Sequence, residues 1–174
     1  MARHAVPNYP YVQARYVGGS QRPTAIVLSL SDTTSDKGAA LAIANYHHSV
    51  VAPPKSYHYI VDENKTYRCI PVDVAAYGNP HRAINVHICA QPHESVPMWE
   101  DGSATKVMYR TADLIADLML AYRIPARNLT GAAEDRWVKH KWRTRGGLIV
   151  RVPGVWPYKS FLDDVKARMT IKTR

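Results

Sequence analysis

The sequence predicts a single α/β domain with a mixed central β-sheet flanked by helices. Short apolar runs typical of buried strands alternate with longer stretches of helical periodicity. Hydrophobic residues make up 46% of the 174 residues, so the chain can bury a core, and this length suits one domain. We expect an N-terminal arm at residues 1–22, the domain at 23–170 and a C-terminal tail at 171–174.

The first predicted elements are a strand and a helix. Residues 25–30, Ala-Ile-Val-Leu-Ser-Leu, are an apolar run after Pro23 and predict a buried strand. The alanine-rich stretch from Asp36 to about His48 predicts a helix, with residues 33–35 as its cap region.

A hairpin and a further strand are predicted next. Residues 57–61 and 66–70 are strand-like and flank Asp-Glu-Asn-Lys at 62–65, which suits a hairpin with a four-residue loop. Residues 84–90 alternate between apolar and polar side chains and predict another strand.

The second half of the chain predicts three helices and one strand. Apolar side chains recur at helical spacing over residues 103–123, which is the clearest helix. Thr130 can cap a shorter helix from Ala132 to about His140. Residues 148–152 predict an apolar strand, and Pro157 opens a last helix.

The charge of the chain is uneven. A formal net charge of +9 comes from 23 lysines and arginines against 14 acids, and residues 101–174 hold fifteen of these bases with only seven acids. Six bases follow one another without an intervening acid: Arg136, Lys139, Lys141, Arg143, Arg145 and Arg151. Two interpretations stay open, a solvated surface or a contact with a polyanion such as cell-wall phosphates, nucleic acid or the acidic surface of a partner protein.

Several other classes of protein are disfavoured. No apolar run approaches the roughly 20 residues of a membrane helix, and no apolar segment follows the N-terminus, so we expect neither a membrane span nor a signal peptide. Cys69 and Cys89 form no CxxC motif and are interpreted as small core residues, although their pairing is left open. Neither a P-loop nor a Gly-x-Ser-x-Gly motif occurs.

Four segments match the motifs of one family in their order along the chain. Residues 56–66, Ser-Tyr-His-Tyr-Ile-Val-Asp-Glu-Asn-Lys-Thr, are similar to its strand–turn–strand motif YHYIVDxDGTI. Residues 73–91, 109–125 and 147–165 are similar to its later motifs, the last through Pro-Gly-Val-Trp-Pro at 153–157. The chain thus resembles, over roughly residues 23–168, the type-2 zinc N-acetylmuramoyl-L-alanine amidases. That family includes phage lysins and the peptidoglycan recognition proteins.

The resemblance implies a zinc site, but two of its three positions have changed. In the family the ligands are a His closing the first strand, a His after the long helix, and an Asp, Cys or His before Pro-Gly. Carried over, these positions are Ser29, His140 and Val152. Serine is a weak zinc ligand and valine is none, so we expect a degenerate site without bound metal. Tyr57 stands where the family's tyrosine assists the reacting amide, and is a catalytic candidate or a half-buried strand aromatic.

Other histidines could supply a relocated metal site. His47 and His48 are neighbours on a predicted helix and point about 100° apart, so they cannot chelate together without help. His58 and His87 lie on predicted strands and could meet across the sheet. We interpret each of these four as a solvated or core histidine.

Two functions follow from the resemblance. In the first, a phage-encoded protein has lost zinc catalysis and binds instead. It would be a capsid decoration, head or tail protein of the virion, or a cell-wall recognition module. As a virion component it would contact phage structural proteins, and it could do so as an oligomer within a larger assembly. In the second, an active zinc endolysin cleaves the amide between N-acetylmuramic acid and L-alanine, with His140 among its ligands. We favour the first because two ligand positions have changed, and expect the protein in the virion or the host cytoplasm.

Overall fold

The computed structural model describes residues 4–30, 38–79, 81–90, 103–131, 140–143, 149–152 and 158–173. In chain order the elements are β1 (Val17–Ser20), β2 (Ala25–Leu30), α1 (Ala39–His48), β3 (Tyr59–Val61), β4 (Thr66–Arg68), β5 (Val74–Ala76), β6 (Ala83–Ile88), α3 (Ser103–Tyr122), η1 (Ala126–Asn128), β7 (Leu129–Gly131), β8 (His140–Arg143), β9 (Ile149–Val152) and α4 (Tyr158–Lys172).

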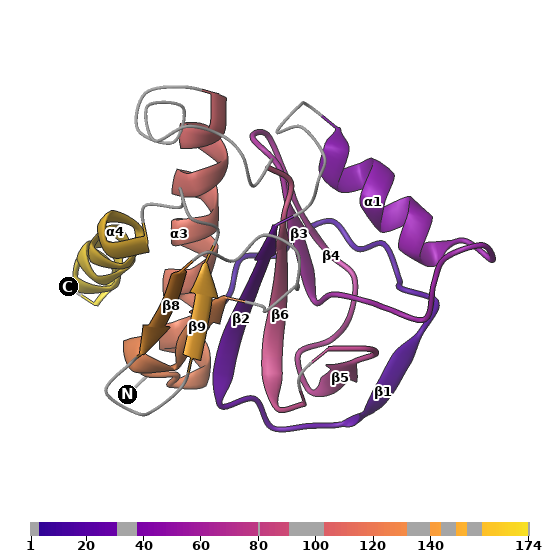
Figure 1. Ribbon diagram of the computed structural model, residues 1–174, viewed down its shortest axis with the longest axis horizontal. Coiled ribbons are helices and arrows are strands. Elements are labelled where there is room, and N and C mark those ends of the chain that lie inside the picture. The colour runs from indigo at the N-terminus through magenta and orange to yellow at the C-terminus, as the bar shows by residue number, and fades with distance from the viewer. Residues whose placement is uncertain are drawn as a thin grey trace.

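A five-stranded mixed sheet forms the centre of the molecule (Figure 1). Its strand order is β4-β3-β6-β2-β7, in which β3, β6, β2 and β7 run parallel and β4 is antiparallel to β3 at one edge. Parallel strands are covered on both faces, which explains why β6 is buried along its whole length and β2 at all but its two end residues. The predicted α/β domain with a mixed central sheet is confirmed.

Helices cover the two faces of the sheet. Helix α3 lies against one face with α4 packed on it, and α1 lies on the other side (Figure 1). The larger core, between the sheet and α3, includes Ile26, Val86, Leu118 and Phe161. The smaller core, under α1, includes Ala40, Ala44, Ile60 and Tyr67. Among the described residues, no helix has the length and apolar character needed to cross a membrane.

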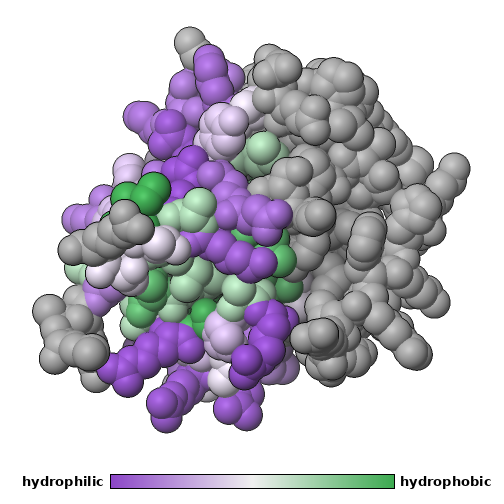
Figure 2. Space-filling view, turned by 90° about the vertical axis from the view of Figure 1, so that its left-hand side faces the viewer, coloured by the Kyte–Doolittle hydropathy of each residue, from purple (hydrophilic) through white to green (hydrophobic). Residues whose placement is uncertain are grey.

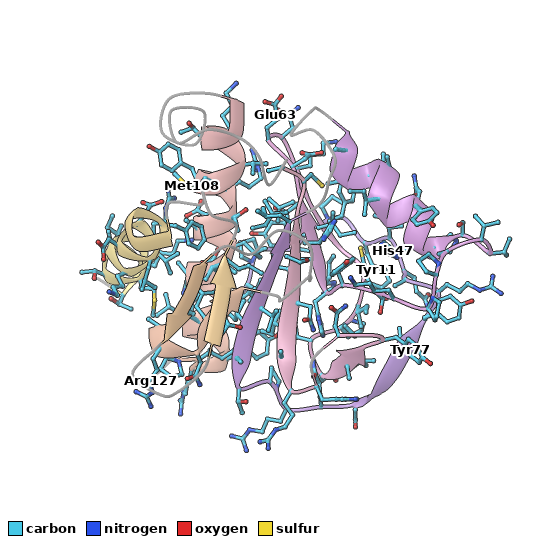
Figure 3. The ribbon with its side chains drawn as sticks, viewed as in Figure 1. Tyr11, His47, Glu63, Tyr77, Met108 and Arg127 are labelled. Atoms are coloured by element: carbon cyan, nitrogen blue, oxygen red, sulfur yellow. The ribbon has the colours of Figure 1, made fainter. Side chains whose placement is uncertain are left out.

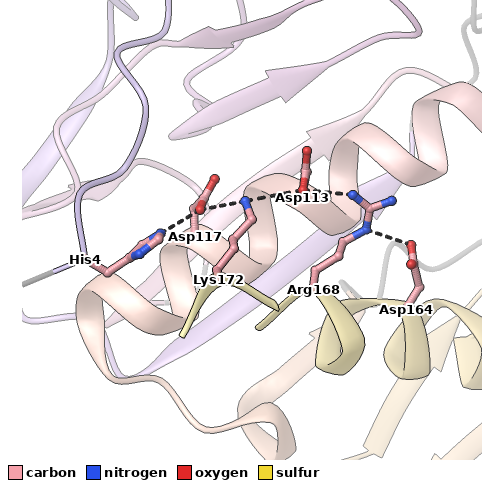
Figure 4. Close-up of polar contacts among 6 residues, drawn as sticks. All are labelled: His4, Asp113, Asp117, Asp164, Arg168 and Lys172. Atoms are coloured by element: carbon pink, nitrogen blue, oxygen red, sulfur yellow. Dashed lines mark hydrogen bonds and ion pairs between the residues drawn. The ribbon is translucent and has the colours of Figure 1, made fainter. Parts of the chain in front are cut away.

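Ion pairs join α3, α4 and the N-terminal segment (Figure 4). The carboxylate of Asp117 accepts hydrogen bonds from His4 Nε2 and Lys172 Nζ, both at 2.7 Å. Arg168 lies 2.8 Å from Asp113 and 3.1 Å from Asp164. These ion pairs hold α4 and the start of the chain against α3. Figure 2 views the molecule from this side, where hydrophilic residues border a smaller apolar area.

The N-terminal segment packs along the edge of the sheet. The Val12 N–H donates to the carbonyl of Arg68, and the Arg68 N–H donates to the carbonyl of Pro10. Farther on, β1 pairs antiparallel with β5. The segment that the sequence predicts as an N-terminal arm, residues 1–22, therefore makes backbone hydrogen bonds with residues more than 50 positions later in the chain.

Most predicted elements are present at the expected places. The strand at 25–30 is β2, and the helix at 103–123 is α3. The hairpin is formed by β3 and β4, both shorter than predicted, and the strand at 84–90 is β6. The strand at 148–152 and the helix after Pro157 are β9 and α4.

One local prediction was wrong. Thr130 does not cap a helix, because it lies in β7, where it is the register partner of Val27 on β2. Pairing with β2 gives residues 129–131 parallel backbone hydrogen bonds and buries Leu129 and Thr130. This long-range pairing outweighs the local preference of Thr130 for a helix cap. His140 belongs to β8 and not to a helix, while the rest of the predicted helix, residues 132–139, lies outside the described residues.

Helix α1 begins later than predicted. Asp36 and the expected cap at residues 33–35 lie outside the described residues, and the helix starts at Ala39 after Gly38, which has a φ of 89°. The first N–H groups of the helix are bound by a residue distant in sequence, since Asp62 accepts hydrogen bonds from the N–H groups of Gly38 and Ala40.

Candidate functional site

Two polar residues, Ser29 and His87, lie on the face of the sheet that α1 covers. Ser29 on β2 and His87 on β6 are register partners, so their side chains emerge on the same face. Ser29 Oγ and His87 Nδ1 are 2.9 Å apart and form a hydrogen bond, with only 7% and 6% of the two residues exposed. Both are the fifth of six residues in their strands, near the carboxyl ends. In open α/β sheets, ligands bind outside these strand ends.

Aromatic rings extend this pair into a cluster. The ring of Tyr57 stacks on His87, with centroids 4.3 Å apart and an interplanar angle of 27°. His47, in the last turn of α1 (Figure 3), meets the Tyr57 ring edge to face at 5.2 Å. Lys55 Nζ lies 5.4 Å from the centroid of the same ring. Ser29, His47, Tyr57 and His87, which we call the His87 cluster, thus come from four separate segments.

The histidines of the cluster are held in the neutral form. Burial, followed by the charges of His47 and Lys55, lowers the pKa of His87 to about 3. Burial also lowers the pKa of His47, whose Nδ1 is buried without a hydrogen-bond partner in the described part of the chain. A neutral imidazole has one nitrogen that can accept a hydrogen bond, so the cluster offers polar groups that a ligand could engage.

His58 has a different environment. Its Nδ1 accepts a hydrogen bond from the Asn85 N–H at 3.0 Å, and its Nε2 lies 2.9 Å from the carbonyl of Val74. The residue is fully buried, and burial lowers its pKa to about 4. His58 is therefore a hydrogen-bonded core histidine, as the sequence indicates. It does not meet His87 across the sheet, because the register pairs His87 with Ile60.

These histidines predict a pH dependence of stability. The pKa of His58 and of His87 lies below the ordinary value of 6.5 in the folded chain, so the unfolded chain binds more protons at acid pH. The stabilisation is complete above pH 6.5 and is lost as pH falls toward 4 and then 3. Below pH 6.5, each of the two histidines should lower the free energy of unfolding by about 1.4 kcal/mol per pH unit until its own pKa in the folded chain is reached.

Urea unfolding at several pH values between 7.5 and 4.5 measures this effect. In the variant His87→Phe the free energy of unfolding should fall less steeply with pH than in the wild type, by about 1.4 kcal/mol per pH unit, because one proton taken up on unfolding is lost. A free energy of unfolding that stays constant over this range would contradict the assignment of two buried neutral histidines.

The three positions to which the resemblance assigns zinc ligands do not form a ligand set within the described residues. The hydroxyl of Ser29 is hydrogen-bonded to His87, and the backbone places His140 opposite Val152 in the β8–β9 ribbon, where valine brings no donor atom. Within the described residues, no three His, Cys, Asp or Glu side chains come together in an arrangement that could hold a metal ion. Ser29, His140 and Val152 thus supply at most one good zinc ligand among them.

The basic segment is only partly described. Arg136, Lys139 and Arg145 lie outside the described residues. Lys141, Arg143 and Arg151 belong to the β8–β9 ribbon, whose register pairs Lys141 with Arg151. This pairing brings two of the basic positions opposite each other, and their contact with a polyanion stays a prediction.

Both cysteines are buried in the core under α1, as predicted, and they do not form a disulfide with each other, which settles the pairing that the sequence left open. Burial raises the pKa of Cys69 to about 12, so this thiol stays protonated and unreactive.

The sequence analysis singled out Ser29 and Tyr57 but missed their connection to His87. The signal was present, because Ser29 and His87 are the polar residues near the ends of two apolar strand-like runs. The parallel pairing of β2 with β6, which is not encoded locally, is needed to bring them together. The place of His47 depends likewise on how α1 packs on the sheet.

Solved structures share this fold over nearly the whole chain. The catalytic domain of XlyA matches with a TM-score of 0.67 at 20% identity, covering 91% of this chain and 99% of that domain. The Staphylococcus aureus hydrolase AmiA in complex with its ligand matches with a TM-score of 0.64 at 18% identity, covering 97% and 86%. The endolysin LysCS, an N-acetylmuramoyl-L-alanine amidase from Clostridium intestinale, matches with a TM-score of 0.57 at 14% identity, covering 94% and 98%.

No protein-family model matches the sequence, and neither does any curated protein sequence. At identities of 14–20%, the structural similarity establishes the fold. The chain has the fold of endolysin and N-acetylmuramoyl-L-alanine amidase catalytic domains, which confirms the fold that the resemblance implies.

Proposed function

We propose that this chain acts on bacterial peptidoglycan and hydrolyses the amide bond between N-acetylmuramic acid and L-alanine. The similar structures include a catalytic domain, a hydrolase and an N-acetylmuramoyl-L-alanine amidase, each matched over most of its length. The observation that carries the proposal is the His87 cluster, a set of buried polar side chains near the carboxyl ends of the central strands of this shared fold.

The residues of the cluster suit the binding and orientation of an amide. The Tyr57 ring and the Ser29 hydroxyl hold the imidazole of His87 in one orientation. Because the imidazole stays neutral at pH 7, it can accept a hydrogen bond from a water molecule or an amide N–H. The unpaired Nδ1 of His47 offers a second polar atom beside Tyr57. The proposal assigns no step to zinc, since the described residues do not form a ligand set for it.

A second candidate function is recognition of the cell wall without cleavage. The observation that favours it is Ser29, which stands at a position where the resemblance implies a zinc-binding histidine and whose hydroxyl is hydrogen-bonded to His87 instead. Both candidates have the same partner, peptidoglycan, and differ in whether a product appears.

Co-sedimentation with purified, protein-free cell walls separates the candidates. We expect the chain to sediment with the walls and soluble stem peptides to appear in the supernatant over time. Sedimentation without release would favour recognition alone, and the absence of both would contradict both candidates. Metal analysis of the protein purified from zinc-supplemented buffer, run in parallel, shows whether release depends on a bound ion.

A role in the virion stays a prediction of the sequence analysis, as do the contacts with phage structural proteins and the oligomeric state. The three similar structures above are described as a catalytic domain, a hydrolase and an amidase, and none as a virion component.

A further inference from the structure

A cavity of about 450 Å³ opens on the other face of the sheet. It lies between the N-terminal segment, the strands β3 and β4, the connection after β4 and the end of α3. The polar residues that line it are His4, Asn8, Tyr59, Arg68, Asp73 and Tyr122. Tyr59 packs in the core on the α3 side, whereas Tyr57 packs in the core on the α1 side. The cavity, which we call the Arg68 cavity, is therefore distinct from the His87 cluster.

Arg68 supplies a cationic group with unused hydrogen-bonding capacity. It is the register partner of Tyr59, so the two side chains share the face that lines the cavity. Its Nε–H is buried and has no hydrogen-bond partner among the described residues. Its guanidinium carbon lies 5.1 Å from the centroid of the Tyr11 ring, which fixes one side of the group. The Arg68 guanidinium lines the cavity, and its planar array of N–H donors suits a carboxylate or phosphate.

An acidic group lies on the same cavity wall. Asp73 is exposed and lines the cavity, and the charges of both Asp73 and Arg68 affect the pKa of the Tyr122 hydroxyl. Burial raises the pKa of Tyr122, the charge of Asp73 raises it further, and the charge of Arg68 opposes this rise. A cation and an anion thus line the same cavity as Tyr122. His4 is less available to a ligand, because its Nε2 is bound to Asp117 at 2.7 Å.

We propose that the Arg68 cavity binds a zwitterionic amino acid or short peptide, with the carboxylate on Arg68 and the ammonium group on Asp73. The volume lies within the range of about 300–1,000 Å³ typical of small-molecule sites. A phosphate dianion suits the site less well, because Asp73 would repel it. The ring of Tyr122, which is 41% exposed, provides apolar surface for the remainder of the ligand.

Calorimetric titration of the full chain with the dipeptide glycyl-leucine tests this proposal. We expect a dissociation constant on the order of 1 mM. Blocking either end of the probe, as in N-acetyl-glycyl-leucine or glycyl-leucine amide, should weaken binding at least about tenfold, because one charge pair is lost. Inorganic phosphate should bind more weakly than the dipeptide.

The variant Arg68→Gln should weaken glycyl-leucine binding by about tenfold or more, while Arg15→Gln, at an exposed position near α1, should leave it unchanged. Circular dichroism checks that both variants fold. The blocked probes keep the test decisive on the wild-type chain if Arg68→Gln does not fold. The proposal is overturned if the wild type shows no binding, if the blocked probes bind equally well, or if phosphate binds more tightly. Since the cavity is separate from the His87 cluster, these results do not depend on peptidoglycan cleavage.

Discussion

Replacing Asp62 with alanine is expected to lower the free energy of unfolding by about 3–5 kcal/mol. Asp62 follows β3 and is only 1% exposed. Its Oδ1 accepts hydrogen bonds from the N–H groups of Asn64 at 2.8 Å and Lys65 at 2.7 Å, which shape the β3–β4 turn. Its Oδ2 accepts hydrogen bonds from the N–H groups of Gly38 at 3.1 Å and Ala40 at 3.0 Å, at the start of α1.

The loss is large because one substitution leaves four donors without their acceptor, two of them where α1 begins. The variant Asp62→Asn keeps one carbonyl oxygen and should lose about half as much. Asp163→Ala is a matched control, because the Asp163 side chain is 61% exposed and forms a surface ion pair with Lys166 at 3.5 Å, and it should change stability by less than about 0.5 kcal/mol. Urea unfolding of the three variants measures these values. If Asp62→Ala lowers the free energy of unfolding by less than about 1 kcal/mol, the β3–β4 turn and the start of α1 are stable without this carboxylate.

Replacing His87 with phenylalanine is expected to reduce cleavage of peptidoglycan by about tenfold or more, because the hydrogen bond that the neutral imidazole would make to a water molecule or to the amide is lost. This prediction rests on the proposed function. Phenylalanine keeps a ring for Tyr57 to stack on, but removes both nitrogens and the hydrogen bond to Ser29. The packing of the cluster should therefore survive better than its polar chemistry.

The release of soluble stem peptides from purified walls, followed at several protein concentrations, measures this effect. His48→Phe is the matched control, since His48 is exposed, bonds to the Gln13 carbonyl and should leave the rate unchanged. Thermal unfolding of both variants separates lost chemistry from lost folding. If His87→Phe cleaves at the wild-type rate, the cluster is structural and the reaction occurs elsewhere on the fold.

Local sequence patterns predicted a helix or hairpin correctly where the residues that form the pattern all lie within that element. The helical periodicity of residues 103–123 matches α3 because the apolar stripe that creates the pattern is the surface buried against the sheet. The hairpin of β3 and β4 was predicted for a similar reason, since strand-like residues flank a turn within ten residues. Where a strand depends on distant partners, as β7 does on β2, the local signal favoured the wrong element.

The candidate site was predictable only in part, because it combines residues from separated segments. Ser29 and Tyr57 were identified through a resemblance that aligns single positions, and this resemblance gave no role to His87. Their convergence depends on parallel pairing of β2 with β6 and on the packing of α1. The Arg68 cavity has no sequence signature either, since its lining residues come from four segments of the chain.

The identity of the product released from purified peptidoglycan tests the central claim most directly. Hydrolysis of the amide between N-acetylmuramic acid and L-alanine leaves stem peptides with a new free amino group on L-alanine and leaves the glycan strands intact. The account predicts this amino group, detected by end-group labelling and mass spectrometry, without new reducing sugar ends. Bound walls that yield no new L-alanine amino groups, or products with new reducing ends instead, would contradict it.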